Sequence, residues 1–292
     1  MPCLFRRTGA GRRSADKERT MAQALVVGNW LLPLLYLALL IDYGATFFLR
    51  ARTHARSPWL WLVAGVHAAV LALRGIHYGH PPAHAQEVLS GVALAMAAVY
   101  AAVEIAGRDR RSGVFVMLLV FLLQYTSSIL LAGWPHEVHA EAAASAWGRL
   151  HVVPALVAYT AFGFACVYGL LYLAARRGLR HHRFGVLFDR LPPLDLLGRM
   201  TWHALVVGFV FMTLTIATGP AVAASGREAA GHLASNPKVL MKMVTGGVAW
   251  VIYAAAMVGR LAAKWPPQRI AAVAVAGYAV VVALLVASAL LP

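Results

Sequence analysis

Five side chains in this sequence combine ligand chemistry with positions inside or beside long apolar segments. They are His67, Arg74, His77, His151 and His203. Imidazole is a common axial ligand of haem iron, and guanidinium suits planar carboxylates such as the propionates of haem. Because an ionisable side chain in hydrocarbon is costly, it usually has a partner or a function. The pattern predicts a haem b site inside a membrane protein.

Three of these residues form a stripe in the segment PWLWLVAGVHAAVLALRGIHYG. His67 and Arg74 are seven positions apart, so they share a helix face about two turns apart, and His77 follows one turn later near the outer surface. In a haem site the imidazole would ligate iron and the guanidinium would neutralise a propionate. In the alternative, His67 bonds to a neighbouring helix and Arg74 extends to the interface.

The other two histidines begin apolar segments on opposite sides. His151 follows Trp147 and Arg149 by about one turn, and it is a candidate to face His77 and complete an outer iron site, with Arg74 or Arg149 on the propionates. The alternative is an interfacial histidine beside an aromatic-belt residue.

His203 lies about one turn from the cytoplasmic surface and is a candidate to pair with His67 as an inner axial pair; the alternative is a polar residue near a helix end. The outer loops also concentrate imidazoles, which would suit a transition-metal entry site. They are His77, His80, His84, His136, His139 and His232.

The elements that carry these residues are apolar runs long enough to cross a bilayer. Hydrophobic residues make up 61% of the chain and charged residues 13%, and the mean hydropathy is +0.69. A run of this length in lipid satisfies its backbone only as a helix. We therefore predict an all-α polytopic membrane bundle of about eight helices, with one domain over 21–292. The expected spans are 23–49, 58–77, 87–106, 113–133, 148–175, 200–220, 238–262 and 270–291.

Arginines gather in alternate connections, after the first, third, fifth and seventh spans. The positive-inside rule makes these connections cytoplasmic and puts both termini outside. The net charge of +15 is then a topology signal that favours the bilayer, and not nucleic acid, as partner. The basic leader 1–20 opposes this bias, and we expect translation to begin at Met21.

Motifs of soluble enzymes are missing from the sequence. It has no Walker loop, no G-x-S-x-G, no H-E-x-x-H and no C-x-x-C-H, and its two cysteines, Cys3 and Cys166, form no dithiol motif. This pattern favours binding and relay of haem over catalysis.

Three stretches carry a family resemblance: LHVVPALVAYTAFGFACVYGLLYL, FDRLPPLDLLGRMTWHALVVGFVFMTLTIATG and NPKVLMKMVTGGVAWVIYAAAMVGR. Over 147–287 the chain resembles the cytochrome c assembly family, the haem-handling membrane proteins of the System II pathway and their HemX-like relatives. The resemblance implies that His151 is an outer axial ligand and that His67 and His203 match membrane-embedded histidines. It also implies a bacterial inner (plasma) membrane and partners among haem-pathway membrane proteins.

The sequence departs from the family in the outer loop that closes with Asn236, Pro237 and Lys238. Family members have Asp-Pro-Lys there, after a tryptophan-rich stretch, whereas GPAVAASGREAAGHLASNPK contains no tryptophan. A second outer histidine near the chain end also has no counterpart. The chain therefore looks more like the HemX-like accessory branch than a haem ligase. A b-type redox or haem-modifying membrane enzyme, or a scaffold with a decayed haem site, are the alternatives.

The arginine asymmetry predicts the position of both chain ends. Reporter fusions at Pro292 and near Arg183 should place the C-terminus outside and the loop between the fifth and sixth spans in the cytoplasm. A cytoplasmic C-terminus would contradict this topology.

Overall fold

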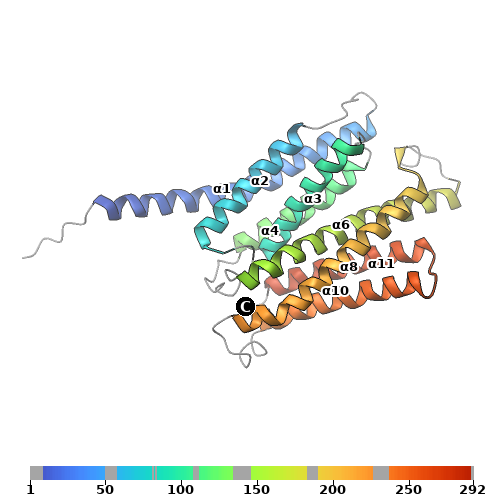
Figure 1. Cartoon of the computed structure of the whole chain (residues 1–292). Coiled ribbons are helices and arrows are strands. Elements are labelled where there is room, and N and C mark those ends of the chain that lie inside the picture. Colours follow the sequence, from blue (N-terminus) through green and yellow to red (C-terminus); the bar gives the residue numbers. More distant parts are fainter. Residues whose placement is uncertain are drawn as a thin grey trace, which may run out of the picture.

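The computed structural model describes residues 9–49, 58–80, 82, 84–107, 112–133, 146–182, 190–225 and 237–290. Across these ranges eight helices are long and apolar enough to cross a membrane, and no strand occurs. The prediction of an all-α membrane bundle is confirmed. Consecutive helices run in opposite directions (Figure 1). They are α1 (Gly9–Phe48), α2 (Pro58–Tyr78), α3 (Ala85–Gly107), α4 (Gly113–Gly133), α6 (Ala146–Arg180), α8 (Leu194–Ser225), α10 (Pro237–Leu261) and α11 (Pro267–Leu290).

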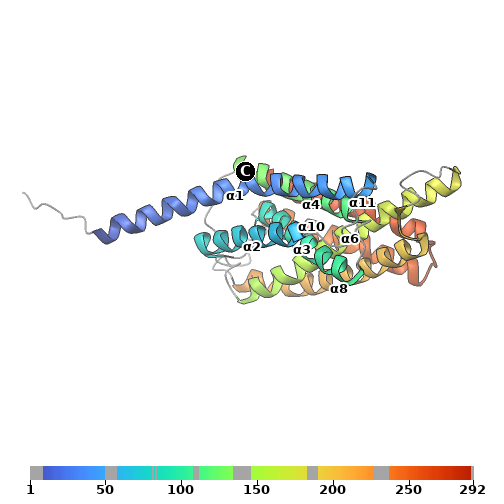
Figure 2. The ribbon, with the colours of Figure 1, turned by 90° about the horizontal axis from the view of Figure 1, so that it is seen from above.

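Helix lengths follow the apolar runs, with extensions at polar ends. The bounds of α4 match the predicted span 113–133, whereas α6 and α8 exceed the predicted 148–175 and 200–220. Hydropathy marks only the part of a helix in hydrocarbon, while the helix itself continues into the headgroup region. The first turns of α1 extend beyond the ends of its neighbours (Figure 2). The side chains of residues 1–15 lie outside the described part, so the Met21 start stays a prediction.

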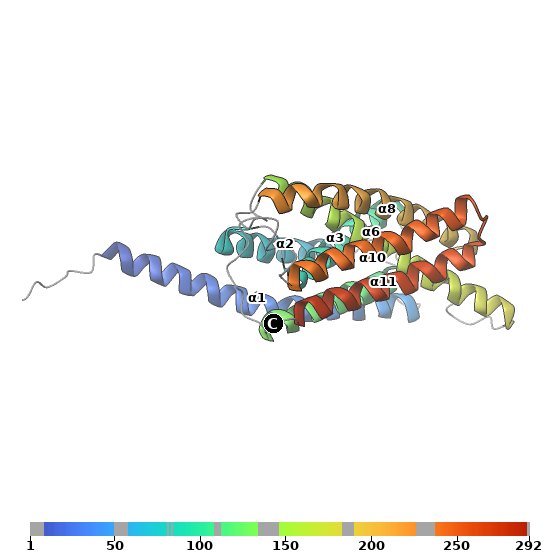
Figure 3. The same ribbon diagram turned by 90° about the horizontal axis from the view of Figure 1, so that it is seen from below.

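The bundle consists of two four-helix groups. In the first group α1 packs on α2 and α4, and α3 packs on α2 and α4. In the second group α6 packs along α8, and α11 packs on α6, α8 and α10. The groups meet where α6 and α11 contact α3. Figure 1 shows the first group above the second, so the two groups overlap when they are seen from above or below (Figure 2, Figure 3).

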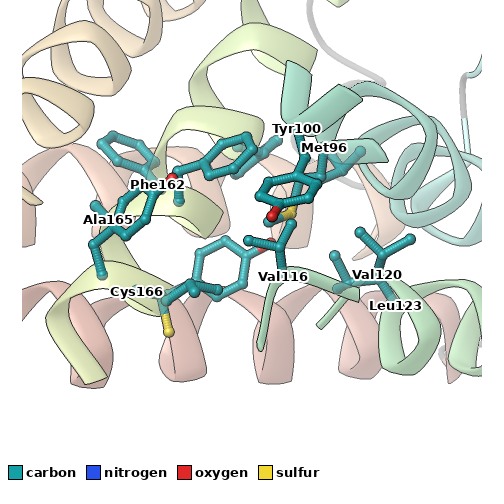
Figure 4. Packing of buried hydrophobic residues seen from close by; sticks show 14 of the residues in the cluster. Met96, Tyr100, Val116, Val120, Leu123, Phe162, Ala165 and Cys166 are labelled. Atoms are coloured by element: carbon teal, nitrogen blue, oxygen red, sulfur yellow. The ribbon is translucent and has the colours of Figure 1, made fainter. Parts of the chain in front are cut away.

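Buried aromatic and aliphatic side chains fill the junction between the groups (Figure 4). Met96 and Tyr100 of α3 and Phe162 of α6 are each 0% exposed. The ring of Phe162 stacks on that of Tyr253 with centroids 3.6 Å apart, which joins α6 to α10. Without a hydrophobic force between helices in lipid, close van der Waals packing of this kind holds the helices together.

Gly208 of α8 provides a test of this packing. A Cβ at Gly208 would collide with the ring of Phe162. This ring is fully buried and stacked on Tyr253, so it cannot easily move away. Gly208→Ala should destabilise the protein by about 1–3 kcal/mol, seen as a lower midpoint of thermal unfolding in detergent.

The matched control is Gly246→Ala, where the added Cβ would meet nothing within 4 Å. Since alanine favours helix over glycine by up to about 1 kcal/mol, this control should leave the midpoint unchanged or raise it. Equal losses from both substitutions would contradict the packing account.

Candidate functional site

His67 lies at the centre of the first group, where both of its ring nitrogens have hydrogen-bond partners. The side chain is 0% exposed. Nδ1 lies 2.9 Å from the hydroxyl of Tyr36 on α1, and Nε2 lies 2.9 Å from Oγ of Ser90 on α3. The rings of Tyr36 and His67 meet edge to face, with centroids 5.6 Å apart.

The direction of these hydrogen bonds follows from the proton of Ser90. Ser90 donates its only hydroxyl proton to Oε1 of Gln124 on α4, at 2.8 Å. Nε2 of His67 must therefore carry the proton and donate it to Ser90. Nδ1 is then the acceptor, and Tyr36 donates to it. The imidazole is neutral and has no lone pair left for a metal in this arrangement.

The chain of hydrogen bonds continues from Gln124 along α4 and across to α1. Nε2 of Gln124 donates to Oγ of Ser128 at 3.1 Å, and Asn29 donates to the Ser128 carbonyl at 2.9 Å. Side chains from all four helices, α1, α2, α3 and α4, thus take part. In lipid such interhelical bonds fix which helices associate. We call Tyr36, His67, Ser90, Gln124 and Ser128 the polar chain.

Arg74 and His77 lie near the end of α2, as the stripe predicted. Arg74 is buried, with 8% of its surface exposed, and it interacts electrostatically with Glu87 of α3 and with Tyr78. Glu87 therefore places a negative charge near this buried guanidinium, whose Nε has no hydrogen-bond partner among the described residues. His77 is half-buried and contacts the ring of Tyr78, with centroids 4.8 Å apart.

His151 lies in the second group, in the second turn of α6, and it faces α8. Its Nδ1 lies 3.2 Å from Oγ1 of Thr218. Thr218 directs its own hydroxyl at the backbone carbonyls of Leu214 and Thr215, each 3.0 Å away. The backbone of Thr215 also interacts with the imidazole.

These contacts suit one tautomer of His151. When the Thr218 proton goes to a carbonyl of its own helix, Oγ1 accepts from the imidazole. In that tautomer Nδ1 of His151 carries the proton, and Nε2 keeps its lone pair. A histidine that donates through one nitrogen and ligates through the other is the usual arrangement at metal and haem iron.

Gly219 of α8 lies close to the ring of His151. A Cβ built at Gly219 of α8 would lie 3.9 Å from Cε1 of His151. Trp147, one turn earlier on the same face of α6, is 48% exposed. Pro154 in α6 and Pro220 in α8 each remove one helical hydrogen bond near the pair. Arg149 is exposed but lies two positions from His151, on another face of the helix.

The structure does not bring His203 to His67. His203 is exposed on α8, and α8 packs on α6, α10 and α11. His67 is buried on α2, which packs on α1 and α3. His77 and His151 likewise belong to helices of different groups, and α3 contacts both of these helices.

Other predicted features fall partly outside the described ranges. His136, His139 and His232 lie there, as do Asn236 and most of the loop before α10. Among the residues that are described, no three histidine, cysteine or acidic side chains are placed to hold a metal ion.

Sequence reasoning missed the partners of the histidines. Three polar residues lie in apolar spans: Gln124, Ser128 and Asn29. Because a polar side chain is costly in hydrocarbon, their positions could have indicated hydrogen-bond partners on other helices. Thr218 gave no such signal, because threonine within a helix commonly bonds to its own backbone.

A family model described as Cytochrome C assembly protein matches residues 84–291, more than two-thirds of the chain. The chain belongs to the cytochrome c assembly protein family. The matched region holds His151 and His203 and begins just before α3, whereas Tyr36, His67, Arg74 and His77 precede it. No curated protein and no solved structure matches the chain. Membership supports a role in c-type cytochrome biogenesis for this multi-pass membrane protein.

The polar chain predicts a structural role for Ser90. Ser90→Ala leaves the Nε2 proton of buried His67 without an acceptor, which should lower the free energy of unfolding by about 1–2 kcal/mol. Thermal unfolding in detergent measures the change. Ser288→Ala is the control, because Ser288 bonds only to Leu285 in its own helix. Equal stability of the two variants would show that the polar chain contributes nothing.

Proposed function

We propose that this protein binds haem b through Nε2 of His151 and holds it during c-type cytochrome biogenesis. The observation that carries the proposal is the Thr218 contact, which can hold Nδ1 of the half-buried imidazole and leave Nε2 for iron. The family match, which includes both residues, supports the same site.

The residues around His151 fit a haem group by their chemistry. The imidazole supplies a neutral nitrogen ligand with its Nδ1 proton already bonded, and Trp147 supplies an aromatic surface one turn away. Gly219 keeps the facing surface of α8 free of a side chain. Haem, when bound, would supply an iron centre whose state its axial ligand tunes. Arg149, the nearest cation in sequence, is exposed in the first turn of α6 on another face from His151.

We further propose an accessory, HemX-like role in the inner (plasma) membrane of a bacterium. His151 would retain haem while the apolar bundle keeps water away, and other membrane proteins of the haem or cytochrome pathway would receive it. The loop before α10 lacks the tryptophans that a haem ligase uses, which favours binding and relay over ligation.

The buried positions favour this proposal over its alternatives. A two-histidine redox site across the bundle needs facing imidazoles at similar depth, and His67 and His203 lie on helices of different groups. A decayed scaffold would leave its histidines facing lipid, whereas His67 is buried and His151 is half-buried. His203, which is exposed, serves as an internal control.

Replacing the ligand and its partner should have graded effects on haem. His151→Ala should lose most bound haem, measured as the haem-to-protein ratio by pyridine haemochrome. Thr218→Val keeps the shape but removes the acceptor for Nδ1, so haem affinity should fall about tenfold, the low end for an outer-shell partner. Thr218→Ser should retain near wild-type affinity.

The control is His203→Ala, which should leave haem content unchanged. Full haem content in His151→Ala protein that unfolds at the wild-type temperature would rule out the assignment. Equal losses from His151→Ala and His203→Ala would show that the effect is not specific to the outer site.

A further inference from the structure

A pocket of about 250 Å³ opens at the end of the second group opposite His151. It lies where the start of α8, the end of α10 and the start of α11 meet the later turns of α6. Tyr172 and Ile270, which are 5% and 2% exposed, form its apolar floor. Half-buried Trp202 adds an aromatic wall.

Two arginines from different helices line this apolar pocket. Arg260 of α10 donates through Nη1 to the carbonyl of Trp265 at 2.9 Å, which uses one of its five N–H groups. Arg199 of α8 pairs with Asp195 at 2.9 Å, and the two side chains are 65% and 81% exposed. Both guanidinium groups keep donors that a ligand can reach.

The pocket lies at the bundle end where α6 finishes with Arg176, Arg177 and Arg180. Two helices also begin there, α8 at Leu194 and α11 at Pro267, and helix N-termini add positive potential. Basic pockets between membrane helices on the cytoplasmic side bind anionic lipid headgroups. Arginines above an apolar floor suit a phosphate that carries acyl chains.

We propose that this pocket binds the phosphate headgroup of an anionic phospholipid. Arg199 and Arg260 hold the phosphate from two sides, and Trp202 and Tyr172 contact the adjoining apolar part. The exposed face of α8 continues beyond the pocket with Val207 and Val210, 44% and 50% exposed, along which an acyl chain can lie. This site is separate from His151 and does not depend on haem binding.

Asp195 limits the strength of the site. Its carboxylate occupies Arg199 and repels a second anion, so a lipid phosphate must compete with it. Removing this charge should therefore strengthen binding, whereas removing either arginine should weaken it. A general loss of folding cannot produce changes of opposite sign.

The test uses the full chain purified in neutral detergent, with native mass spectrometry to count bound phosphatidylglycerol. Arg199→Gln and Arg260→Gln should each weaken binding roughly fivefold, the effect of about 1 kcal/mol per arginine near a membrane surface. Asp195→Asn should strengthen it. Arg180→Gln removes the same charge from the same bundle end outside the pocket and should bind as the wild type does.

Two further arms identify the ligand and separate the sites. Phosphatidylcholine should bind weakly, and millimolar inorganic phosphate should not displace phosphatidylglycerol; displacement would show a free-anion site and overturn the lipid assignment. Unchanged binding in Arg199→Gln and Arg260→Gln, or weaker binding in Asp195→Asn, would overturn the pocket itself. His151→Ala should bind the lipid normally, so failure of the haem proposal leaves this result intact.

Discussion

A polar side chain within hydrocarbon has to find its hydrogen-bond partner inside the protein, and this constraint governs the chemistry of the bundle. It separates the two histidines that face neighbouring helices. His67 gives both nitrogens to the polar chain, so its imidazole is committed to holding the first group together. His151 contacts Thr218 through Nδ1, and Thr218 also bonds to its own helix. The proposed function rests on the lone pair of the other nitrogen, Nε2.

The division into two groups gives these histidines different roles. The family match covers α3 through α11 and so includes the whole second group, where His151 and Thr218 lie. The helices that precede the match, α1 and α2, are joined to it by the polar chain through Ser90 and Gln124. Tight packing around Phe162 then fixes α6 against α8 and α10. The same contacts that position α6 and α8 also position the His151–Thr218 pair.

The sequence predicted the helices better than the site. Every predicted span lies largely within a helix, and α4 agrees at both ends, because the length of an apolar run measures the bilayer directly. His67 and Arg74 are both buried on α2, as expected for two residues that share one helix face. The pairing of histidines could not be predicted, because it depends on which helices are neighbours in space. Packing between helices decides this, and residue spacing along one helix does not reveal it. Thr218 was invisible for the same reason: its role appears only when α6 and α8 are placed side by side.

The central claim is that the bundle holds haem on an imidazole whose second nitrogen is already bonded. The most direct measurement is the visible absorption spectrum of the wild-type protein, purified in detergent from cells with abundant haem. We expect a Soret band that copurifies with the protein, with a position typical of histidine-ligated haem b. A folded protein that shows no Soret band under these conditions would contradict it.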